Sequence, residues 1–215
     1  MEFTFMRELF SFIISREEMI RSLSLEHLHL VLLAGIIAIV IGLVAGVIIT
    51  YYPKAANVVL GVCQTMMVIP SFAMLGFLLP LFGIGFTTGV IALILYTLLP
   101  VTRNTYIGIR EIPLSVLEAA KGMGMSELAI LIKIKIPLAL PVVMAGFRTA
   151  MVMVVGIAAI AAYVGAGGLG ELIFHGISRS QPYRIVTGAI FVSIIAVTID
   201  LILGKVEDIL LARTR

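Results

Sequence analysis

The chain has 215 residues, of which 61% are hydrophobic and only 13% are charged. A soluble domain is about half apolar and about a quarter charged, so this composition excludes an ordinary soluble protein and predicts a surface that largely faces lipid. The formal net charge of +3 does not indicate a nucleic-acid partner. The basic residues are scattered around apolar runs and form no stripe.

The first segment, residues 1–28, mixes acidic and basic side chains with apolar ones. It lacks the basic start and the small-residue cleavage site of a signal peptide. We therefore expect a retained amphipathic helix that lies near the membrane surface.

The rest of the chain is dominated by uncharged runs, and no charged residue occurs between Lys54 and Arg103. That run is longer than one helical crossing of a bilayer, so it must fold back on itself. The pattern predicts an all-α, polytopic membrane bundle with about five spans. We expect these spans at about residues 30–51, 56–80, 86–102, 140–164 and 185–204. They form a single membrane domain over 29–207, followed by a short cytoplasmic tail over 208–215.

The second expected span contains Pro70 and ends at Pro80. A proline inside a span frees a backbone carbonyl, which neighbouring helices or a water-lined path must then satisfy. Residues 81–85 supply the turn that leads to the third span.

Lysine and arginine residues indicate the orientation of the bundle. When the segments are assigned to alternate sides, more of these residues fall on the side of the loop 103–139 than on the other side. This excess predicts that the loop and the C-terminus are cytoplasmic and that the N-terminus is outside. An even number of spans, which would place both termini on one side, stays open.

The loop over residues 103–139 is long for so economical a membrane chain, and this favours a function for it. Pro113 suits the start of one short amphipathic helix, and Ser126 can cap a second. Gly124 interrupts the helical pattern between them, and Pro137 marks the return to the bilayer. Two short helices at an angle form a convex knob that fits a groove in another protein.

The stretch EAAKGMGMSELAILIKIKIP, which occupies residues 118–137, resembles the EAA loop of ABC-importer permeases. The positions in register are Glu118, Ala119, Ala120, Gly124, Ile134 and Pro137. Ile136 stands where the family usually has leucine. The resemblance implies a multi-pass subunit in the plasma (inner) membrane of a prokaryote, surrounded by membrane lipid, whose loop docks on a partner.

The same resemblance implies the partners of the chain. They are two copies of an ATP-binding ABC subunit, a second permease chain that is identical or paralogous, and an extracytoplasmic substrate-binding protein. ATP and Mg would be held by the ATPase, and we expect no cofactor in this chain. The sequence agrees, because it contains no phosphate-binding Gly-x4-Gly-Lys-Ser/Thr motif.

Four further segments look like the osmoprotectant branch of these permeases, which imports glycine betaine, carnitine and choline. They are residues 64–85, 98–110, 136–150 and 163–174. Permeases for methionine share the glycine-rich part of the last segment, so import of methionine or another small amino acid stays the alternative. A quaternary ammonium group is usually captured by aromatic faces. Since the chain has no Trp and few aromatic residues in the spans, we expect specificity to lie mainly in the external binding protein.

Residues 165–170 formally match a dinucleotide-binding fingerprint, but they follow a membrane span rather than a strand. We interpret them instead as an irregular segment near the outer mouth that ends the fourth span or contributes to a gate. His27, His29 and His175 lack the spacing of a zinc site, so no metal site is expected. An intramembrane hydrolase would need a catalytic constellation that the spans do not show, and no catalytic residue is assigned.

The sequence also contains candidate functional residues inside the expected spans and at their ends. Candidates for the pathway or a gate are Gln64, Pro70, Ser71, Tyr163, Gly165, Gly167 and Gly168. Arg148 and Asp200 fall in or at the ends of apolar spans, where a charge is costly unless it is hydrated or paired. They either extend towards the interface or form an intramembrane ion pair. Gly42 and Gly46 allow close helix packing within or between subunits.

Overall fold

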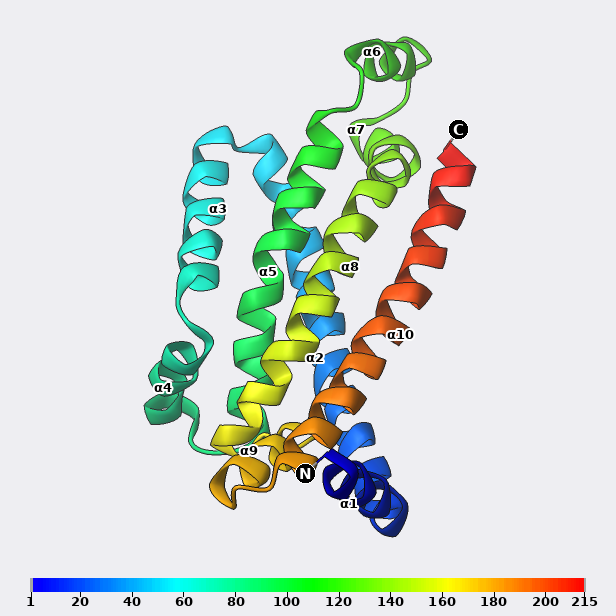
Figure 1. Ribbon diagram of the computed structural model, residues 1–215. Coiled ribbons are helices and arrows are strands. Elements are labelled where there is room, and N and C mark those ends of the chain that lie inside the picture. Colours follow the sequence, from blue (N-terminus) through cyan, green and yellow to red (C-terminus); the bar gives the residue numbers. More distant parts are fainter. Residues whose placement is uncertain (1, 215) are drawn as a thin grey trace.

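The computed structural model describes residues 2–214, and every regular element in this range is helical (Figure 1). The elements are α1 (Glu2–Ser15), α2 (Glu17–Tyr51), α3 (Pro53–Val68), α4 (Ser71–Phe82), α5 (Phe86–Arg110), α6 (Leu114–Gly122), α7 (Glu127–Ile130), the π-helix η1 (Leu131–Lys135), α8 (Ile136–Ala161), the 3-10 helix η2 (Ala162–Val164), α9 (Gly170–Ser178) and α10 (Pro182–Thr214). The predicted all-α fold is confirmed.

Four helical stretches are long and apolar enough to cross a membrane, and they are centred on α2, α5, α8 and α10. The pair α3 and α4 meets the same criterion but is bent by 104° at its break. If the bent pair crosses as one span, the count is the five that the sequence predicts.

The predicted helix boundaries were wrong in several places. Residues 1–28 are not one amphipathic helix, because α1 ends at Ser15 and the remainder belongs to α2. The acidic Glu17 and Glu18 occupy the first turn of α2, where they complement the positive end of the helix dipole. At the other end of the chain, α10 continues through Thr214, so the expected tail is part of a helix.

The expected second span is broken rather than continuous. Ile69 is extended (φ −62°, ψ 128°) because the residue before a proline is disfavoured in the helical region, and α4 begins directly after Pro70. Pro80 lies inside α4 and does not end it. The helix ends instead at Gly83, whose φ of +76° suits glycine.

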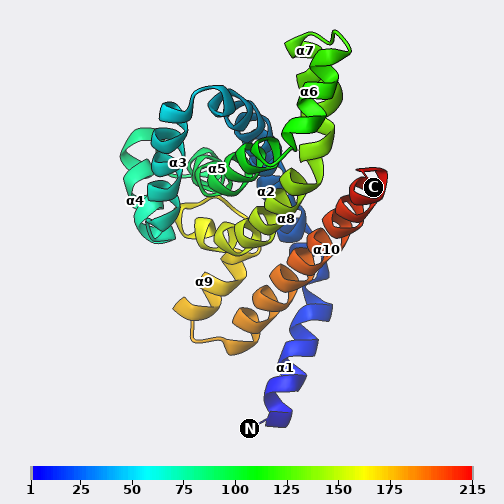
Figure 2. The same cartoon turned by 90° about the horizontal axis from the view of Figure 1, so that it is seen from above.

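The core of the bundle lies among α2, α5 and α8, with α3 and α4 on one side and α10 on the other (Figure 2). Helices α2 and α5 pack closely against each other through two glycines of α2. A Cβ atom at Gly42 would lie 2.7 Å from Val101 Cγ1, and one at Gly46 would overlap Thr105. The small-residue pair therefore serves packing within this subunit.

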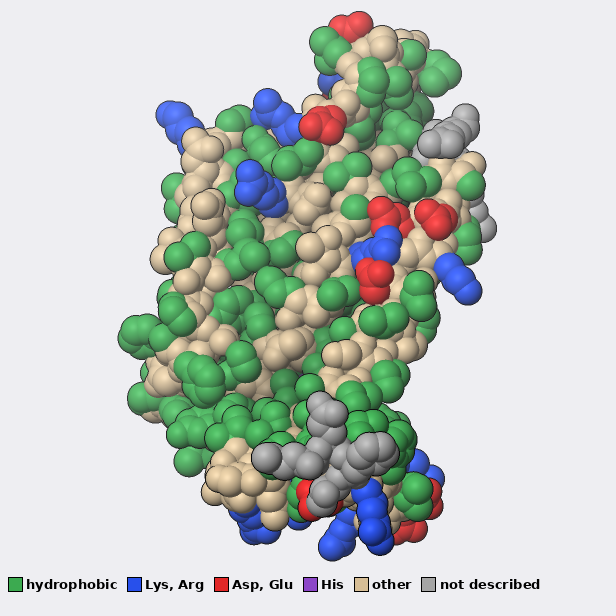
Figure 3. Space-filling model, in the orientation of Figure 1, with side chains coloured by type: hydrophobic (Ala, Val, Ile, Leu, Met, Phe, Trp, Pro, Cys, Tyr) green, Lys and Arg blue, Asp and Glu red, His purple; other side chains and the backbone are tan. Residues whose placement is uncertain are grey.

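The bundle has two distinct ends, which we call the α6 end and the α9 end. The α6 end carries α6, α7 and the C-terminus, and the α9 end carries α9, α1 and the N-terminus (Figure 1). Most charged side chains on the face in Figure 3 gather at these ends, with a hydrophobic belt between them. One cluster of charges interrupts the belt.

Candidate functional site

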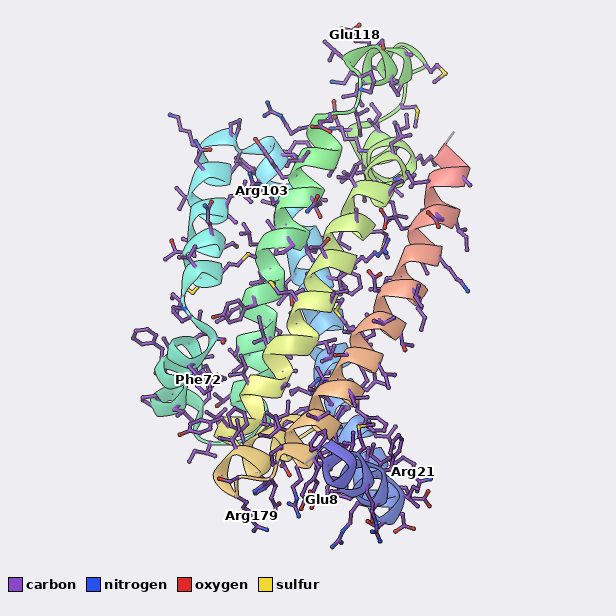
Figure 4. All side chains as sticks on the ribbon, in the orientation of Figure 1. Glu8, Arg21, Phe72, Arg103, Glu118 and Arg179 are labelled. Atoms are coloured by element: carbon purple, nitrogen blue, oxygen red, sulfur yellow. The ribbon has the colours of Figure 1, made fainter. Side chains whose placement is uncertain are left out.

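The helical hairpin of α6 and α7 projects beyond the rest of the bundle (Figure 1). It is shorter than the predicted loop 103–139, because α5 runs on to Arg110 and because η1 and then α8 follow α7 directly from Leu131. Glu118 lies at the far tip of this hairpin (Figure 4). Glu118 and Ala119 are exposed, whereas Ala120 is buried at 1% exposure and forms the inner face of α6.

Gly124 makes the turn between the two short helices. Its φ is +79°, and its amide donates to the carbonyl of Lys121 at 2.9 Å. Ser126 then starts α7, because its hydroxyl accepts a hydrogen bond from the backbone N–H of Ala129 at 3.2 Å. This cap is the one that the sequence predicts.

A salt bridge that the sequence reasoning missed closes the hairpin. Lys121 Nζ lies 2.8 Å from Glu127 Oε1 across the turn. The hydrogen bond raises the pKa of Lys121 and lowers the pKa of Glu127. The opposite charges on either side of the predicted turn were the available signal.

The tip of the hairpin also exposes large apolar side chains. Leu114 is 68% exposed, Met123 74% and Leu128 65%. A hollow of about 330 Å³ between the two helices is lined by Leu117, Glu118 and neighbouring residues. Apolar side chains that protrude beyond the bundle, beside a carboxylate, suit docking into another protein.

The remaining two positions of the EAA motif lie away from this tip. Ile134 is half-buried in η1, and Pro137 is exposed in the first turn of α8. Pro137 has no N–H to donate to the carbonyl four residues earlier, that of Lys133, and the wider π-helical turn lies over this stretch. The helix therefore continues through Pro137 instead of ending there.

A second candidate region is the exposed face of α3. Ala56 is the one buried residue among those described in this helix. Asn57, Gly61 and Gln64 recur at helical spacing, and all are exposed. A hollow of about 570 Å³ lies along this face down to Pro70. A polar stripe on a membrane helix suits a water-lined path or another protein better than lipid.

The helix break at Pro70 is stabilised from α5. The hydroxyl of Tyr96 donates a hydrogen bond to the carbonyl of Ile69, which the break leaves without a helical partner. A neighbouring helix thus supplies the hydrogen bond that the break leaves unmade at Ile69. Ser71, the first residue of α4, is half-buried beside the break.

The glycine-rich turn after η2 lies at the α9 end. Gly165, Gly167 and Gly168 have φ values of +77°, +83° and +86°, which side chains other than glycine rarely adopt. The amide of Gly168 donates to Glu26 Oε2 at 3.3 Å. The next residue of α2, His27, is fully buried, and its Nε2 donates to the carbonyl of Val155 at 3.1 Å.

Sequence reasoning did not assign Glu26 or His27 to this turn. The two residues are about 140 positions from the glycines in sequence, and no local pattern connects them. The N-terminal part of α2 therefore holds the turn in place. Tyr163, in η2 just before the turn, is 66% exposed.

The intramembrane charges form a three-residue cluster between α8 and α10. Arg148 Nε lies 2.6 Å from Asp200 Oδ1, and Nη2 lies 2.9 Å from Oδ2. Glu207, which the sequence reasoning missed, accepts from Nη1 at 3.1 Å. Gly204 leaves room for the guanidinium, since a Cβ there would lie 2.9 Å from Arg148 Cζ. The structure thus pairs Arg148 with Asp200, as the second of the two alternatives expects.

A helical bundle with four crossings, or five if the bent pair of α3 and α4 is one span, and with a protruding hairpin defines a polytopic membrane protein. The comparisons define the family. The model for "Binding-protein-dependent transport system inner membrane component" matches residues 38–215. The chain therefore belongs to this family, the permease subunits of ABC importers. It is a transport subunit and not an enzyme, and it acts with an ATPase and a substrate-binding protein.

Two curated relatives cover most of the chain. The carnitine transport permease protein OpuCB of Listeria monocytogenes is 41% identical over 182 residues, which are 85% of this chain and 84% of the relative. The glycine betaine/carnitine/choline transport system permease protein OpuCB of Bacillus subtilis is 40% identical over the same length and coverage. Among solved structures, the inward-facing MetNI methionine ABC transporter matches with a TM-score of 0.78 at 23% identity. That match covers 89% of this chain and 95% of the other, and it shows the shared fold.

Proposed function

We propose that this chain lines the translocation pathway of an ABC importer for quaternary-ammonium osmoprotectants. The observation that carries the proposal is the identity of about two residues in five to relatives that are named for carnitine, glycine betaine and choline transport. These three solutes share a trimethylammonium group, so one chemical feature defines the substrate class. The likeness to the methionine transporter is a likeness of fold alone.

The α6 end is the cytoplasmic end in this proposal, and the N-terminus lies outside. Lys121, Lys133 and Lys135 are in or beside the hairpin at that end, in agreement with the positive-inside rule. Glu118 and the exposed apolar side chains of the hairpin dock on the ATPase. ATP and Mg are bound by that ATPase, and this chain contributes no nucleotide site.

Two permease chains, identical or paralogous, enclose the pathway, and two ATPase copies serve them. The polar face of α3 supports this arrangement, because it is left exposed by the single chain and is unsuited to lipid. Gln64, Pro70 and Ser71 then line the path, and the glycine-rich turn forms part of its outer gate. Lipid covers the remaining apolar surface of the bundle.

The test is reconstitution of the chain with its ATPase, its binding protein and any paralogous permease in liposomes. We expect ATP-dependent uptake of labelled carnitine, choline or glycine betaine, and no uptake without ATP. Uptake of labelled methionine is measured in the same way, as the matched alternative substrate. Uptake of methionine with no uptake of any quaternary amine would contradict the proposal, and the mass of the complex would show whether it contains two permease chains.

A further inference from the structure

Three aromatic side chains from separate parts of the chain meet near the α9 end. Phe72 lies in the first turn of α4, Tyr163 in η2 and Phe174 in α9. The ring centroids are 5.5 Å apart for Phe72 and Tyr163, 5.2 Å for Tyr163 and Phe174, and 6.3 Å for Phe72 and Phe174. We call this group the aromatic triad.

The rings of the aromatic triad are steeply tilted against one another. The interplanar angles are 76° and 87° for the two contacts of Phe72, and 55° for the contact between Tyr163 and Phe174. Such edge contacts leave ring faces free. Phe72 remains 51% exposed and Tyr163 66% exposed. The triad is therefore an open aromatic surface and not part of the buried core.

The position of the triad connects the two candidate pathway features. Phe72 follows Pro70, where the broken span bends and the hollow along α3 ends. Tyr163 precedes Gly165, where the glycine-rich turn begins. The rings thus lie between the polar hollow and the turn that is assigned to the outer gate. Any rearrangement of either segment would move the rings relative to one another.

We infer that the aromatic triad is a contact site for the trimethylammonium group of the transported solute. The inference rests on the proposed function. A quaternary ammonium has no N–H to donate, so the available attraction is to the negative faces of aromatic rings within about 6 Å of the centroid. Several ring faces in one place supply that attraction without a fixed carboxylate, which would hold a passing cation too tightly.

With this site, the chain adds aromatic selectivity of its own to the specificity that the sequence analysis expects mainly in the external binding protein. The sequence shows few aromatic residues in the spans, and the triad members are separated by as many as about a hundred positions. Folding brings them together at the outer end of the bundle. The external binding protein then delivers the solute to a surface of matching chemistry.

The experiment uses the absence of Trp from the chain. Phe174→Trp keeps an aromatic face in the triad and introduces a single indole. The purified full-length variant in lipid nanodiscs is titrated with choline and with its neutral isostere 3,3-dimethylbutan-1-ol, and indole emission is recorded. We expect a saturable response to choline at a concentration about fivefold to thirtyfold below that for the neutral alcohol, as cation–π attraction predicts.

Second substitutions test the neighbouring ring. Tyr163→Leu in the Phe174→Trp chain should raise the half-saturating choline concentration by about fivefold to thirtyfold, and Tyr163→Phe should leave it nearly unchanged. Equal responses to choline and the alcohol would overturn the inference and identify an apolar membrane anchor. The inference would also be overturned if choline changed the indole emission of neither the Phe174→Trp variant nor the Phe72→Trp variant. If proteoliposomes with the wild-type transporter import no quaternary amine, the proposed function itself fails. If they import one, but Tyr163→Leu leaves the half-saturating choline concentration of the Phe174→Trp chain unchanged, only the triad assignment fails.

Discussion

The sharpest prediction concerns the turn in the hairpin of α6 and α7. Gly124 has a φ of +79°, and a Cβ atom at this residue would meet open space. Gly124→Ala therefore introduces no clash, and its cost is purely conformational, about 1–2 kcal/mol for an L-residue in the left-handed region. If the ATPase binds the hairpin in this conformation, its affinity for the permease should fall by up to about fivefold to thirtyfold.

The matched control is Gly122→Ala. Gly122 lies two residues earlier in α6, and an added Cβ there also meets open space, but its φ is not positive. Alanine in a helix is favoured over glycine by about 0.5–1 kcal/mol, so this variant should bind the ATPase at least as well as wild type. The assay is titration of the purified ATPase onto each permease variant in nanodiscs, with membrane expression quantified in parallel. If the ATPase binds the Gly124→Ala permease as tightly as the Gly122→Ala permease, its affinity does not depend on the conformation of this turn.

Two predictions concern the bundle itself. Gly46→Val should destabilise the protein by about 1–3 kcal/mol, because the added carbons overlap α5. The control, Gly76→Val, should not destabilise it, because a side chain there meets open space. Equal thermal unfolding midpoints of the two variants in detergent would refute this prediction. Asp200→Asn should lower that midpoint more than Glu207→Gln does, because Asp200 accepts two of the three hydrogen bonds from Arg148. A larger loss for Glu207→Gln would show that the short bidentate contact is not the stronger half of the cluster.

The hairpin of α6 and α7 is the part of the site that could be predicted best, since its signals are local. Ser126 caps a helix through its own hydroxyl, and Gly124 marks a turn through its own φ preference. Helix boundaries were predicted less well. Hydropathy locates where a segment stops preferring lipid, but backbone hydrogen bonds continue through charged residues, as α5 does to Arg110 and α10 to Thr214.

The sequence by itself determined the membrane location, the all-helical fold and the family, because these follow from composition and from short motifs whose residues are neighbours in the chain. The tertiary structure decided which distant residues meet. Arg148 donates a hydrogen bond to Glu207, and Glu26 accepts one from the turn at Gly168. The aromatic triad forms only because α4, η2 and α9 lie together in the fold. Helical periodicity specifies the face on which a side chain lies, whereas the packing and bending of whole helices specify what that face meets.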